Sequence, residues 1–455
     1  MRTYQQSLLR WFHTLSPFKL LLFFYLIAVF ISAILMSFPF VYQEGTEIAF
    51  IDRLFTAISA LSVTGLSTIS IADTLSVTGI VILACIMQVG ALGVMAIGTL
   101  IWLLLGKKVG LKERHLIMTD QNQTTFEGMV RLIKQLVYIL FTVELVASFV
   151  LGTYFMYYFP TAGQAYLHGV FQTISAVSNG GFALSNESLA LFSNDYFVQL
   201  VTMLLIIFGA IGFPVLMEVK EFLAAKIRRT QAKRFSLFAK LTTVTFFMLV
   251  LVGTLFIYML DAESFFAGKS WHESLFYSLF QSVTTRSGGL STMDVSQLTE
   301  ENHLFMTALM FIGASPSSAG GGIRTTTFAL AVLFIMAYAR GRRHIRIFNR
   351  EVHEEDVLKA VAVIMIAIML VFVCSILMSI TEPFSLSAIL FEATSAFGTV
   401  GLSLGITGEL SEFSKVILML LMFIGRIGII TLLFIFKPNK GNSGIHYPKE
   451  KMIIG

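Results

Sequence analysis

The chain has 455 residues, of which 56% are hydrophobic and 13% are charged, with a formal net charge of +5 and a mean hydropathy of +0.80. The charged share is about half that of soluble proteins, and apolar runs of about 18 residues or more recur, which excludes a soluble globular protein and indicates an integral membrane protein. The positive charge does not indicate nucleic acid as a partner, because Lys and Arg gather in the segments between the apolar runs.

Four consecutive units share one plan, which is an apolar span, a half-length apolar run and a second apolar span. We place the unit boundaries at 1–118, 119–232, 233–345 and 346–455. In order, the predicted elements are 20–40, 55–61 and 75–105; 135–159, 166–177 and 196–217; 241–260, 272–285 and 303–339; and 357–380, 385–397 and 413–436. The half-length runs are too short to cross roughly 30 Å of hydrocarbon at about 1.5 Å per residue. We expect them to be re-entrant helices that enter and leave on the same side.

Each half-length run ends in a turn that closes on a glycine followed by Leu or Phe. The four turns are Ser62-Val63-Thr64-Gly65-Leu66, Ser178-Asn179-Gly180-Gly181-Phe182, Arg286-Ser287-Gly288-Gly289-Leu290 and Thr399-Val400-Gly401-Leu402, with glycines 116, 108 and 112 residues apart. This spacing indicates an internal repeat. Irregular backbone at membrane depth must be buried in protein or line a watery cavity. The predicted fold is therefore an all-α integral membrane protein with eight transmembrane helices and four re-entrant pore helices around one central pore.

The positive charges predict the orientation of the chain. Most Lys and Arg residues lie in the N-terminal segment, in the three long segments between units and in the tail, whereas the turn side carries only Arg53, Lys269, Arg286 and Lys415. The positive-inside rule then places both termini in the cytoplasm and all four turns outside.

The turns can replace the water of a cation without a fixed charge. Backbone carbonyls from four convergent strands supply a ring of oxygen ligands, and glycine allows the dihedrals that let successive carbonyls face one axis. Each half-length helix would also direct the negative end of its dipole toward the centre. The predicted ion ligands are Val63, Thr64, Gly65, Asn179, Gly180, Gly181, Ser287, Gly288, Gly289, Thr399, Val400 and Gly401. The alternative is that the glycines only permit tight turns or close helix packing.

The four turns, in this order, resemble those of the Trk/Ktr/HKT superfamily of potassium uptake proteins, and most closely those of the membrane subunit of the bacterial Ktr system. Any one motif is loose, but the ordered set is specific, and the resemblance covers nearly the entire chain. It implies that Gly65, Gly181, Gly289 and Gly401 form a selectivity filter. Some plant relatives that favour sodium have serine at the first of these positions, so glycine at all four implies a preference for potassium.

The resemblance also implies partners. Proteins of the Ktr type are homodimers with one pore per subunit, they bind a cytoplasmic ring of nucleotide-binding subunits, and sodium often stimulates their uptake. For this chain it implies a bacterial plasma membrane protein with potassium as substrate, sodium as activator and no bound cofactor. The basic segments 220–240 and 340–350 are candidate docking sites. Because the positive-inside rule alone explains these charges, the docking prediction depends on the resemblance.

A run of small residues interrupts the last span of the third unit. Its members are Gly313, Ala314, Ser315, Pro316, Ser317, Ser318, Ala319, Gly320, Gly321 and Gly322. In a helix interior Gly costs about 1 kcal/mol and Pro about 3 kcal/mol, so we expect a break facing protein or water. We predict a gate below the filter. A passive kink is the alternative, and the resemblance favours the gate, because the family carries an intramembrane loop at this place.

Arg426 lies in the middle of the last span, where an arginine is costly and usually faces a cavity or the protein interior. We predict that it projects into the pore near 313–322 and raises the barrier to cations, and the resemblance implies an arginine of the fourth unit there. A structural role as partner of loop carbonyls is the alternative, and both can hold. We also consider a pair between Arg286 and Glu392 near the external mouth, and Glu144 as an intramembrane carboxylate.

Two other classes of protein compete with a channel-like pore. A secondary transporter with alternating access often has inverted repeats, whereas these repeats all run in the same sense, and proton coupling would need a carboxylate such as Glu144 in the path. An intramembrane enzyme needs a nucleophile with a base or a metal. The eight histidines lie in loops or near span ends, Cys85 and Cys374 lie within apolar runs, and no Walker-type motif is present, so we predict neither an enzyme nor a nucleotide site on this chain.

Overall fold

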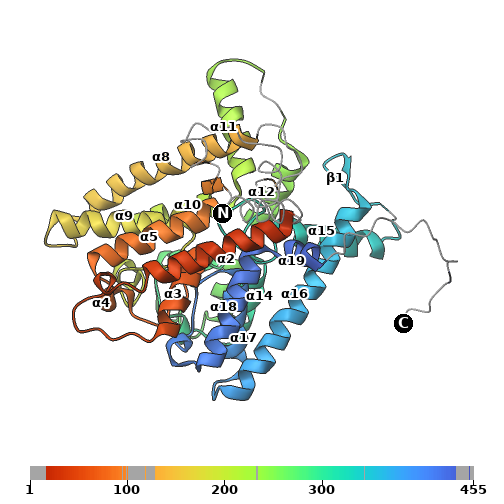
Figure 1. Ribbon diagram of the computed structural model, residues 1–455. Coiled ribbons are helices and arrows are strands. Elements are labelled where there is room, and N and C mark those ends of the chain that lie inside the picture. Colours follow the sequence, from red (N-terminus) through yellow and green to blue (C-terminus); the bar gives the residue numbers. More distant parts are fainter. Residues whose placement is uncertain are drawn as a thin grey trace, which may run out of the picture.

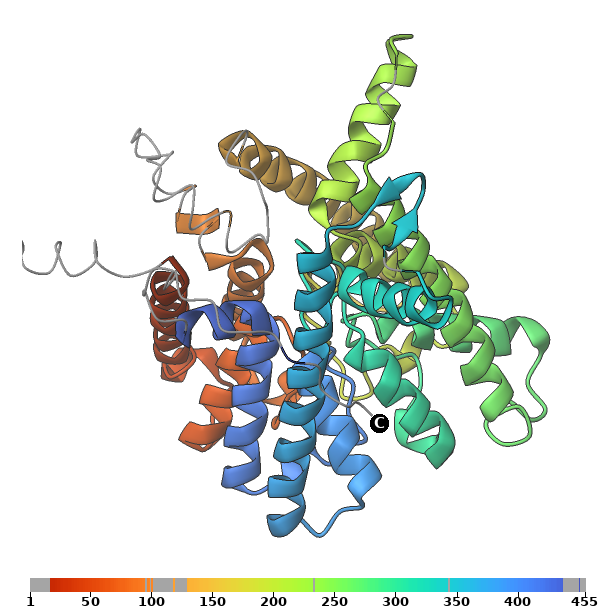
Figure 2. The same cartoon turned by 90° about the vertical axis from the view of Figure 1, so that its right-hand side faces the viewer.

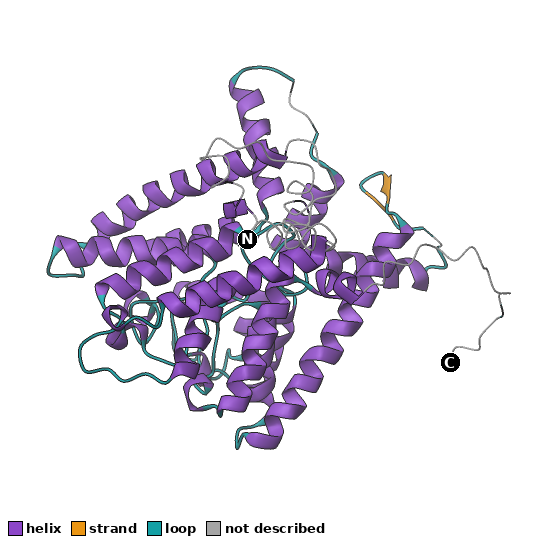
Figure 3. Ribbon diagram, viewed as in Figure 1, coloured by secondary structure: helices purple, strands orange, loops and turns teal. Residues whose placement is uncertain are grey.

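The computed structural model describes residues 17–94, 96–98, 100, 118, 129–231, 234–342, 344–436 and 450. Within them the helices are joined by loops, and the strands form one antiparallel hairpin, β1 (Arg346–Ile347) and β2 (Arg350–Glu351) (Figure 3). The N-terminal segment before residue 17, the basic loop with Lys107, Lys108, Lys112 and Arg114, and most of the basic tail lie outside the described residues.

Each unit consists of a long first helix, a shorter second helix and a third helix (Figure 1). The first helices are α2 (Pro17–Leu35), α8 (Met129–Phe155), α12 (Leu237–Leu260) and α16 (Glu354–Thr381). The second helices are α3 (Phe50–Ser62), α9 (Ala162–Ser178), α13 (Trp271–Thr284) and α17 (Leu386–Gly398). The third helices are α5 (Val77–Leu92), α10 (Tyr196–Ala210), α14 (Glu300–Phe311) and α18 (Glu412–Ile427). Three of them are followed by α11 (Phe213–Ile227), α15 (Thr325–Ala339) and α19 (Ile429–Phe436), and short helical segments α4 (Ile71–Thr74), η1 (Pro39–Val41), η2 (Ala190–Phe192), η3 (Val295–Gln297) and η4 (Thr407–Glu409) complete the loops.

Polar caps explain where the second helices begin. The hydroxyl of Thr161 accepts a hydrogen bond from the amide of Gln164 at the start of α9. Ser385 caps α17 in the same way. At the start of α13, Ser270 and Glu273 form a capping box in which each side chain accepts from the backbone of the other. These caps fix the loop end of three of the second helices, whereas α3 begins after Ala49 without a side-chain cap.

Four of the described helices are long and apolar enough to cross a membrane, namely the first helices of the four units. A fifth candidate is the pair α10 and α11, which meet at an angle of 105°. The prediction of an unbroken second span in units one, two and four is therefore wrong. These spans break at Gly93, Gly212 and Gly428, each with a positive φ of 87° to 97° that a helix cannot accommodate.

The same short pattern marks all three unexpected breaks. The sequences are Gly-Ala-Leu-Gly at 90–93, Gly-Ala-Ile-Gly at 209–212 and Gly-Arg-Ile-Gly at 425–428. The predicted break in unit three begins with Gly-Ala-Ser-Pro at 313–316, so the third helix of every unit stops at an equivalent place. The paired glycines are a sequence signal for the helix breaks, which hydropathy alone does not indicate.

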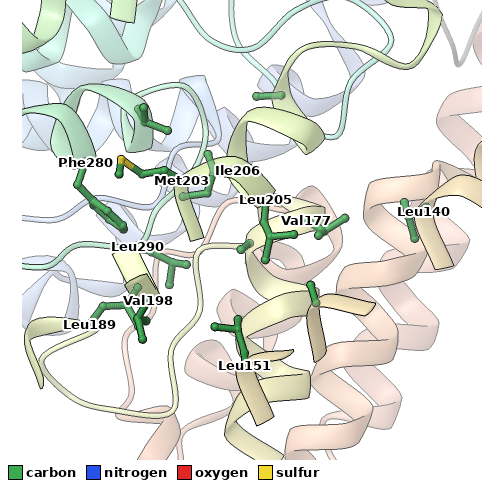
Figure 4. Close-up of a cluster of buried hydrophobic side chains, with 14 of the residues drawn as sticks. Leu140, Leu151, Val177, Leu189, Val198, Met203, Leu205, Ile206, Phe280 and Leu290 are labelled. Carbon is green, nitrogen blue, oxygen red and sulfur yellow. The ribbon is translucent and has the colours of Figure 1, made fainter. Parts of the chain in front are cut away.

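Four hydrophobic clusters join the units pairwise into a closed ring. Units one and two share the cluster that contains Leu61 and Phe182. Units two and three share another, in which Leu290 packs among side chains of unit two such as Val198 (Figure 4). Units three and four share a third, with Met310 and Phe391. The last, which contains Phe55 and Leu418, joins unit four back to unit one.

Unit four therefore lies beside unit one although the two are at opposite ends of the sequence (Figure 2). The ring of Tyr25 lies 5.3 Å from that of Phe423. The Nζ atom of Lys415 lies 2.9 Å from the Oδ1 atom of Asp52, and both side chains are largely buried. This pair accounts for Lys415, which the sequence left as an isolated charge on the turn side.

We expect Gly425→Ala to destabilise the protein. A Cβ atom at this position would lie 1.9 Å from the carbonyl oxygen of Phe397, so α18 could no longer pack on α17. Overpacking of this kind costs about 1–3 kcal/mol. Thermal unfolding of the detergent-solubilised protein measures the effect. Gly163→Ala on α9 is the control, because nothing lies within 4 Å of its Cβ position, and an equal melting temperature for the two variants would contradict the packing described here.

Candidate ion pathway

The four turn glycines meet in one ring at the inner ends of the second helices. A Cβ atom on Gly65 would lie 2.8 Å from the Cα of Gly181, and one on Gly181 would lie 3.0 Å from the Cα of Gly289. A Cβ on Gly289 would lie 3.5 Å from the Cα of Gly401, and one on Gly401 would lie 3.1 Å from the Cα of Gly65. Each glycine thus contacts the next in unit order, and no side chain fits inside this ring.

The backbone of the four turns follows one pattern. The ring glycines have φ values of 94°, 70°, 70° and 94° in unit order. Two residues earlier, Val63, Asn179, Ser287 and Thr399 have φ values of 58°, 58°, 67° and 48°, which is uncommon for residues other than glycine. Three of these four residues cap the C-terminus of a second helix. The same strained conformation at four equivalent positions points to a shared role.

Hydrogen bonds behind the turns fix the direction of the main-chain oxygens. The amides of Thr64, Gly180, Gly288 and Val400 donate to the carbonyls of Ser59, Ser175, Thr284 and Ser395, at 2.7 to 2.9 Å. None of the peptide bonds in these four described turns is cis. In a trans peptide the N–H and C=O point in opposite directions, so the carbonyls of Val63, Asn179, Ser287 and Thr399 point away from the second helices.

A further set of oxygens lies at the level of the glycines. A Cβ on Gly401 would be 2.2 Å from the carbonyl oxygen of Thr64. On Gly65 it would be 2.7 Å from that of Gly180, and on Gly289 it would be 2.5 Å from that of Val400. The ring is therefore rich in main-chain oxygen. The second helices direct their C-terminal, partly negative ends toward it, which favours a cation there.

A cavity of about 880 Å³ opens above the ring, and all four glycines line it. Its wall also includes the side chains of Asn186, Glu187, Asp294 and Lys269. Next to it, hydrogen bonds from Asn186 and Ser70 lower the pKa of the Asp73 carboxyl group. Two acidic wall residues and this neighbouring carboxylate against one lysine make the cavity favourable to cations.

The ten residues predicted as a gate form irregular backbone between α14 and α15. The amides of Ser315 and Ala319 donate to the carbonyls of Ala210 and Gly209, at 3.0 and 3.1 Å, and the carbonyl of Ser317 accepts from Phe213 at 2.9 Å. The loop is thus attached to the break between α10 and α11.

The other end of the loop contacts the ring from below. The amide of Gly321 donates to the hydroxyl of Thr399 at 2.7 Å. A Cβ on Gly320 would lie 2.5 Å from the hydroxyl of Ser287, and one on Gly322 would lie 3.0 Å from the Cα of Gly398. The loop therefore lies directly beneath two of the four strained residues, and its glycines permit that approach.

Two arginines hold this loop. Arg426 donates to the carbonyl of Ala319 in the loop and to that of Gly90 at the end of α5 in the neighbouring unit one. These contacts are those that a structural role for Arg426 requires, and its gating role stays a prediction. Arg324, which the sequence did not single out, donates to the carbonyls of Gly320 and Ser315. Its position two residues after the glycine run, immediately before α15, was the signal available.

The pair considered between Arg286 and Glu392 does not form. Arg286 is fully buried and donates to the carbonyl of Ile312, just before the loop, at 2.6 Å. Glu392 accepts instead from Ser403, Leu404 and Thr407 of its own unit. The pair does not form because the Glu392 carboxylate is bonded within its own unit. Arg286 makes its hydrogen bond to Ile312 through Nη1, while its buried Nε and Nη2 atoms have no hydrogen-bond partner.

Glu144 lies on α8 with only 5% of its surface exposed. Its Oε1 atom accepts from the amide of Gln88 on α5 at 2.5 Å. It is not among the residues that line the cavity above the ring. The structure thus places this carboxylate between helices of units one and two.

Comparisons with known proteins identify the family and the fold of the chain. The family model described as the cation transport protein TrkH matches residues 21–444. The Ktr system potassium uptake protein D of Bacillus subtilis (strain 168) is 53% identical, over 97% of this chain and 98% of its own length. The Ktr system potassium uptake protein B of the same organism is 34% identical over the full length of both chains. The crystal structure of the potassium transporter TrkH from Vibrio parahaemolyticus has a TM-score of 0.70 at 19% identity, over 91% of this chain and 84% of that one, and thus shares the fold.

Proposed function

Because the chain belongs to the TrkH family of cation transport proteins, we propose that it is a potassium uptake protein of the plasma membrane in which the four-glycine ring is the selectivity filter. The observation that carries this proposal is the convergence of Gly65, Gly181, Gly289 and Gly401 from four units, with main-chain oxygens at their level. The names of its relatives, which are potassium uptake proteins, supply the ion. Membership of this family makes the chain a cation transport protein and not an enzyme.

In this proposal the four first helices and the four broken third helices cross the membrane, which gives eight spans and four pore helices. A third helix of 16 residues, such as α5 or α18, is about 24 Å long, so it covers most of the hydrocarbon before the glycine break. The helix that follows each break would complete the crossing. Both termini would then be cytoplasmic, in agreement with the distribution of Lys and Arg.

Transport would be passive and channel-like. A potassium ion enters the cation-favouring cavity, exchanges its water for carbonyl oxygens in the ring, and meets the 313–322 loop below. The loop would close the path at rest and open when a cytoplasmic nucleotide-binding ring acts on the membrane subunit. The relatives named as Ktr system proteins support a partner subunit. A homodimer of this chain and stimulation of its uptake by sodium are part of the proposal.

The alternative is a secondary transporter that couples uptake to protons or sodium. The four units all run in the same sense around one ring, which fits a pore better than two inverted halves. The one carboxylate weighed for coupling, Glu144, contacts Gln88 and does not line the cavity above the ring. Passive uptake accordingly remains the proposal.

Rubidium uptake into potassium-starved cells that lack other uptake systems tests both readings. Cells that carry the wild-type chain together with its cytoplasmic partner should accumulate rubidium, whereas cells without it should not. The Glu144→Gln variant should retain uptake within about twofold, because the amide can still bond to Gln88 and carries no coupling proton. Loss of uptake in this variant, with normal amounts of protein in the membrane, would favour the coupled transporter.

A further inference from the structure

A hydroxyl group behind each turn is bonded to the backbone of that turn. The four residues are Ser59, Ser175, Thr284 and Ser395, one from each second helix, and all are fully buried. We call them the hydroxyl collar. Each lies about one helical turn before the residue with the strained backbone. Its own main-chain carbonyl accepts the hydrogen bond from the turn amide that is described above. One side chain and one carbonyl of the same residue thus hold each turn.

The collar divides into two chemically different halves. In units one and four, the hydroxyls of Ser59 and Ser395 accept from the amides of Gly65 and Gly401, both at 3.1 Å. In units two and three, the hydroxyls of Ser175 and Thr284 donate to the carbonyls that follow the ring glycines, those of Phe182 and Leu290, both at 2.6 Å.

The ring glycines divide in the same way, which is an independent observation. Gly65 and Gly401 have φ values of 94°, whereas Gly181 and Gly289 have values of 70°. The residue before the glycine is Thr64 or Val400 in the first pair and a glycine in the second. The units with an accepting hydroxyl are therefore those with the more extended glycine, and the two halves of the ring differ in conformation as well as in hydrogen bonding.

We propose that the hydroxyl collar is a set of positioning residues that determines ion selectivity, with Ser59 and Ser395 as its dominant members. This inference rests on the proposed function, because it assumes that the ring is the filter. In this proposal, side chains that do not contact the ion determine the width of the glycine ring.

The reason lies in the geometry of the peptide between the ring glycine and its predecessor. When Ser59 accepts from the amide of Gly65, the trans peptide directs the carbonyl of Thr64 the opposite way. That oxygen is the one that lies 2.2 Å from the Cβ position of Gly401. Ser395 acts on Val400 by the same route. These two hydroxyls thus hold two ring oxygens in place.

Ser175 and Thr284 act on a different peptide. They fix carbonyls one residue beyond the ring glycine, where the chain leaves the ring. Their loss would loosen the exit of the turn without releasing a ring oxygen. The two halves of the collar should therefore have unequal effects on selectivity.

Buried helical hydroxyls more often bond to the carbonyl three or four residues earlier in their own helix. Ser278 on α13 does so, since its hydroxyl donates to the carbonyl of Ser274 at 2.7 Å. Ser278 is as buried as the hydroxyl collar and also lies on a second helix. Its hydroxyl bonds only to carbonyls of its own helix and not to the backbone of a turn. It therefore provides a matched control for the removal of a buried hydroxyl.

The test compares sodium with rubidium uptake in cells that carry the chain and its partner. Ser59→Ala and Ser395→Ala should each raise the ratio of sodium to rubidium uptake about tenfold, which corresponds to about 1.4 kcal/mol. Ser175→Ala and Thr284→Val should raise the ratio of sodium to rubidium uptake by less than about threefold, which is half of the tenfold effect on a logarithmic scale. Ser395→Thr, which keeps a hydroxyl group, should retain the wild-type ratio of sodium to rubidium uptake. The control Ser278→Ala should retain it as well.

A second measurement covers variants that reach the membrane poorly. Potassium should raise the melting temperature of the purified wild-type protein more than sodium does, and this difference should disappear in Ser59→Ala and Ser395→Ala but persist in Ser278→Ala. If the two collar variants keep the wild-type ratio and the wild-type difference, the collar proposal is overturned while the filter proposal stands. If the wild-type chain itself takes up no rubidium, both proposals fail.

Discussion

Gly289→Ser is expected to weaken rubidium uptake by at least about tenfold in affinity and to admit sodium, because it forces open the ring on which selectivity depends. A Cβ atom at this position would lie 2.5 Å from the carbonyl oxygen of Val400 and 2.6 Å from the Cα of Gly181. Both are backbone atoms of neighbouring units, so no side-chain rotation relieves the contact. The φ of 70° adds strain for any residue with a Cβ.

A second glycine separates crowding from backbone strain. Gly268, in the loop between α12 and α13, has a φ of 80°, but nothing lies within 4 Å of its Cβ position. Gly268→Ser therefore introduces comparable strain without a clash and should leave the affinities for rubidium and sodium unchanged. Equal selectivity in the two variants, measured by competition between rubidium and sodium, would contradict the assignment of the ring as the filter.

The repeat and the convergence of its turns could be predicted from the sequence because both depend on local patterns. Glycines such as Gly65 and Gly401 recur at near-constant spacing. A turn that follows a half-length helix within a membrane must be buried in protein or line an aqueous cavity. The broken third helices could not be read from hydropathy, because Gly93, Gly212 and Gly428 lie inside apolar runs. Only the conformation of these glycines, which hydropathy does not record, ends the helix.

The partners of Arg286 and Arg324 could not be predicted from the sequence, whereas loop carbonyls were the alternative partners considered for Arg426. Arg286, Arg324 and Arg426 all donate to main-chain carbonyls and not to acidic side chains. A carbonyl is present at every residue, so a search for complementary charges such as Glu392 finds the wrong partner. What decides the outcome is the irregular backbone of 313–322, whose carbonyls are not used by a helix and are therefore available.

The two arginines at the loop hold it from different sides. Arg324 belongs to the helix that follows the loop, and it bonds to Gly320 and Ser315 within the same unit. Arg426 comes from unit four and also bonds to Gly90 of unit one. Opening the path below the ring by moving the loop would break the contact between Arg426 and Ala319, whereas the contacts of Arg324 could move with the loop.

Arg426→Ala is therefore expected to raise the maximal rate of rubidium uptake several-fold and to weaken its dependence on the cytoplasmic partner. The alanine removes the donor to Ala319 and Gly90 and also a positive charge below the ring. Arg426→Lys should give an intermediate rate, because one ammonium group keeps the charge but cannot reach both carbonyls as a planar guanidinium does. Arg131→Ala, at the exposed start of α8 and outside the candidate docking segments 220–240 and 340–350, is the control for loss of a cationic side chain. If Arg426→Ala shows the wild-type rate and affinity of uptake, Arg426 has a structural role alone. The barrier to cations below the ring would then be formed by the backbone of the 313–322 loop.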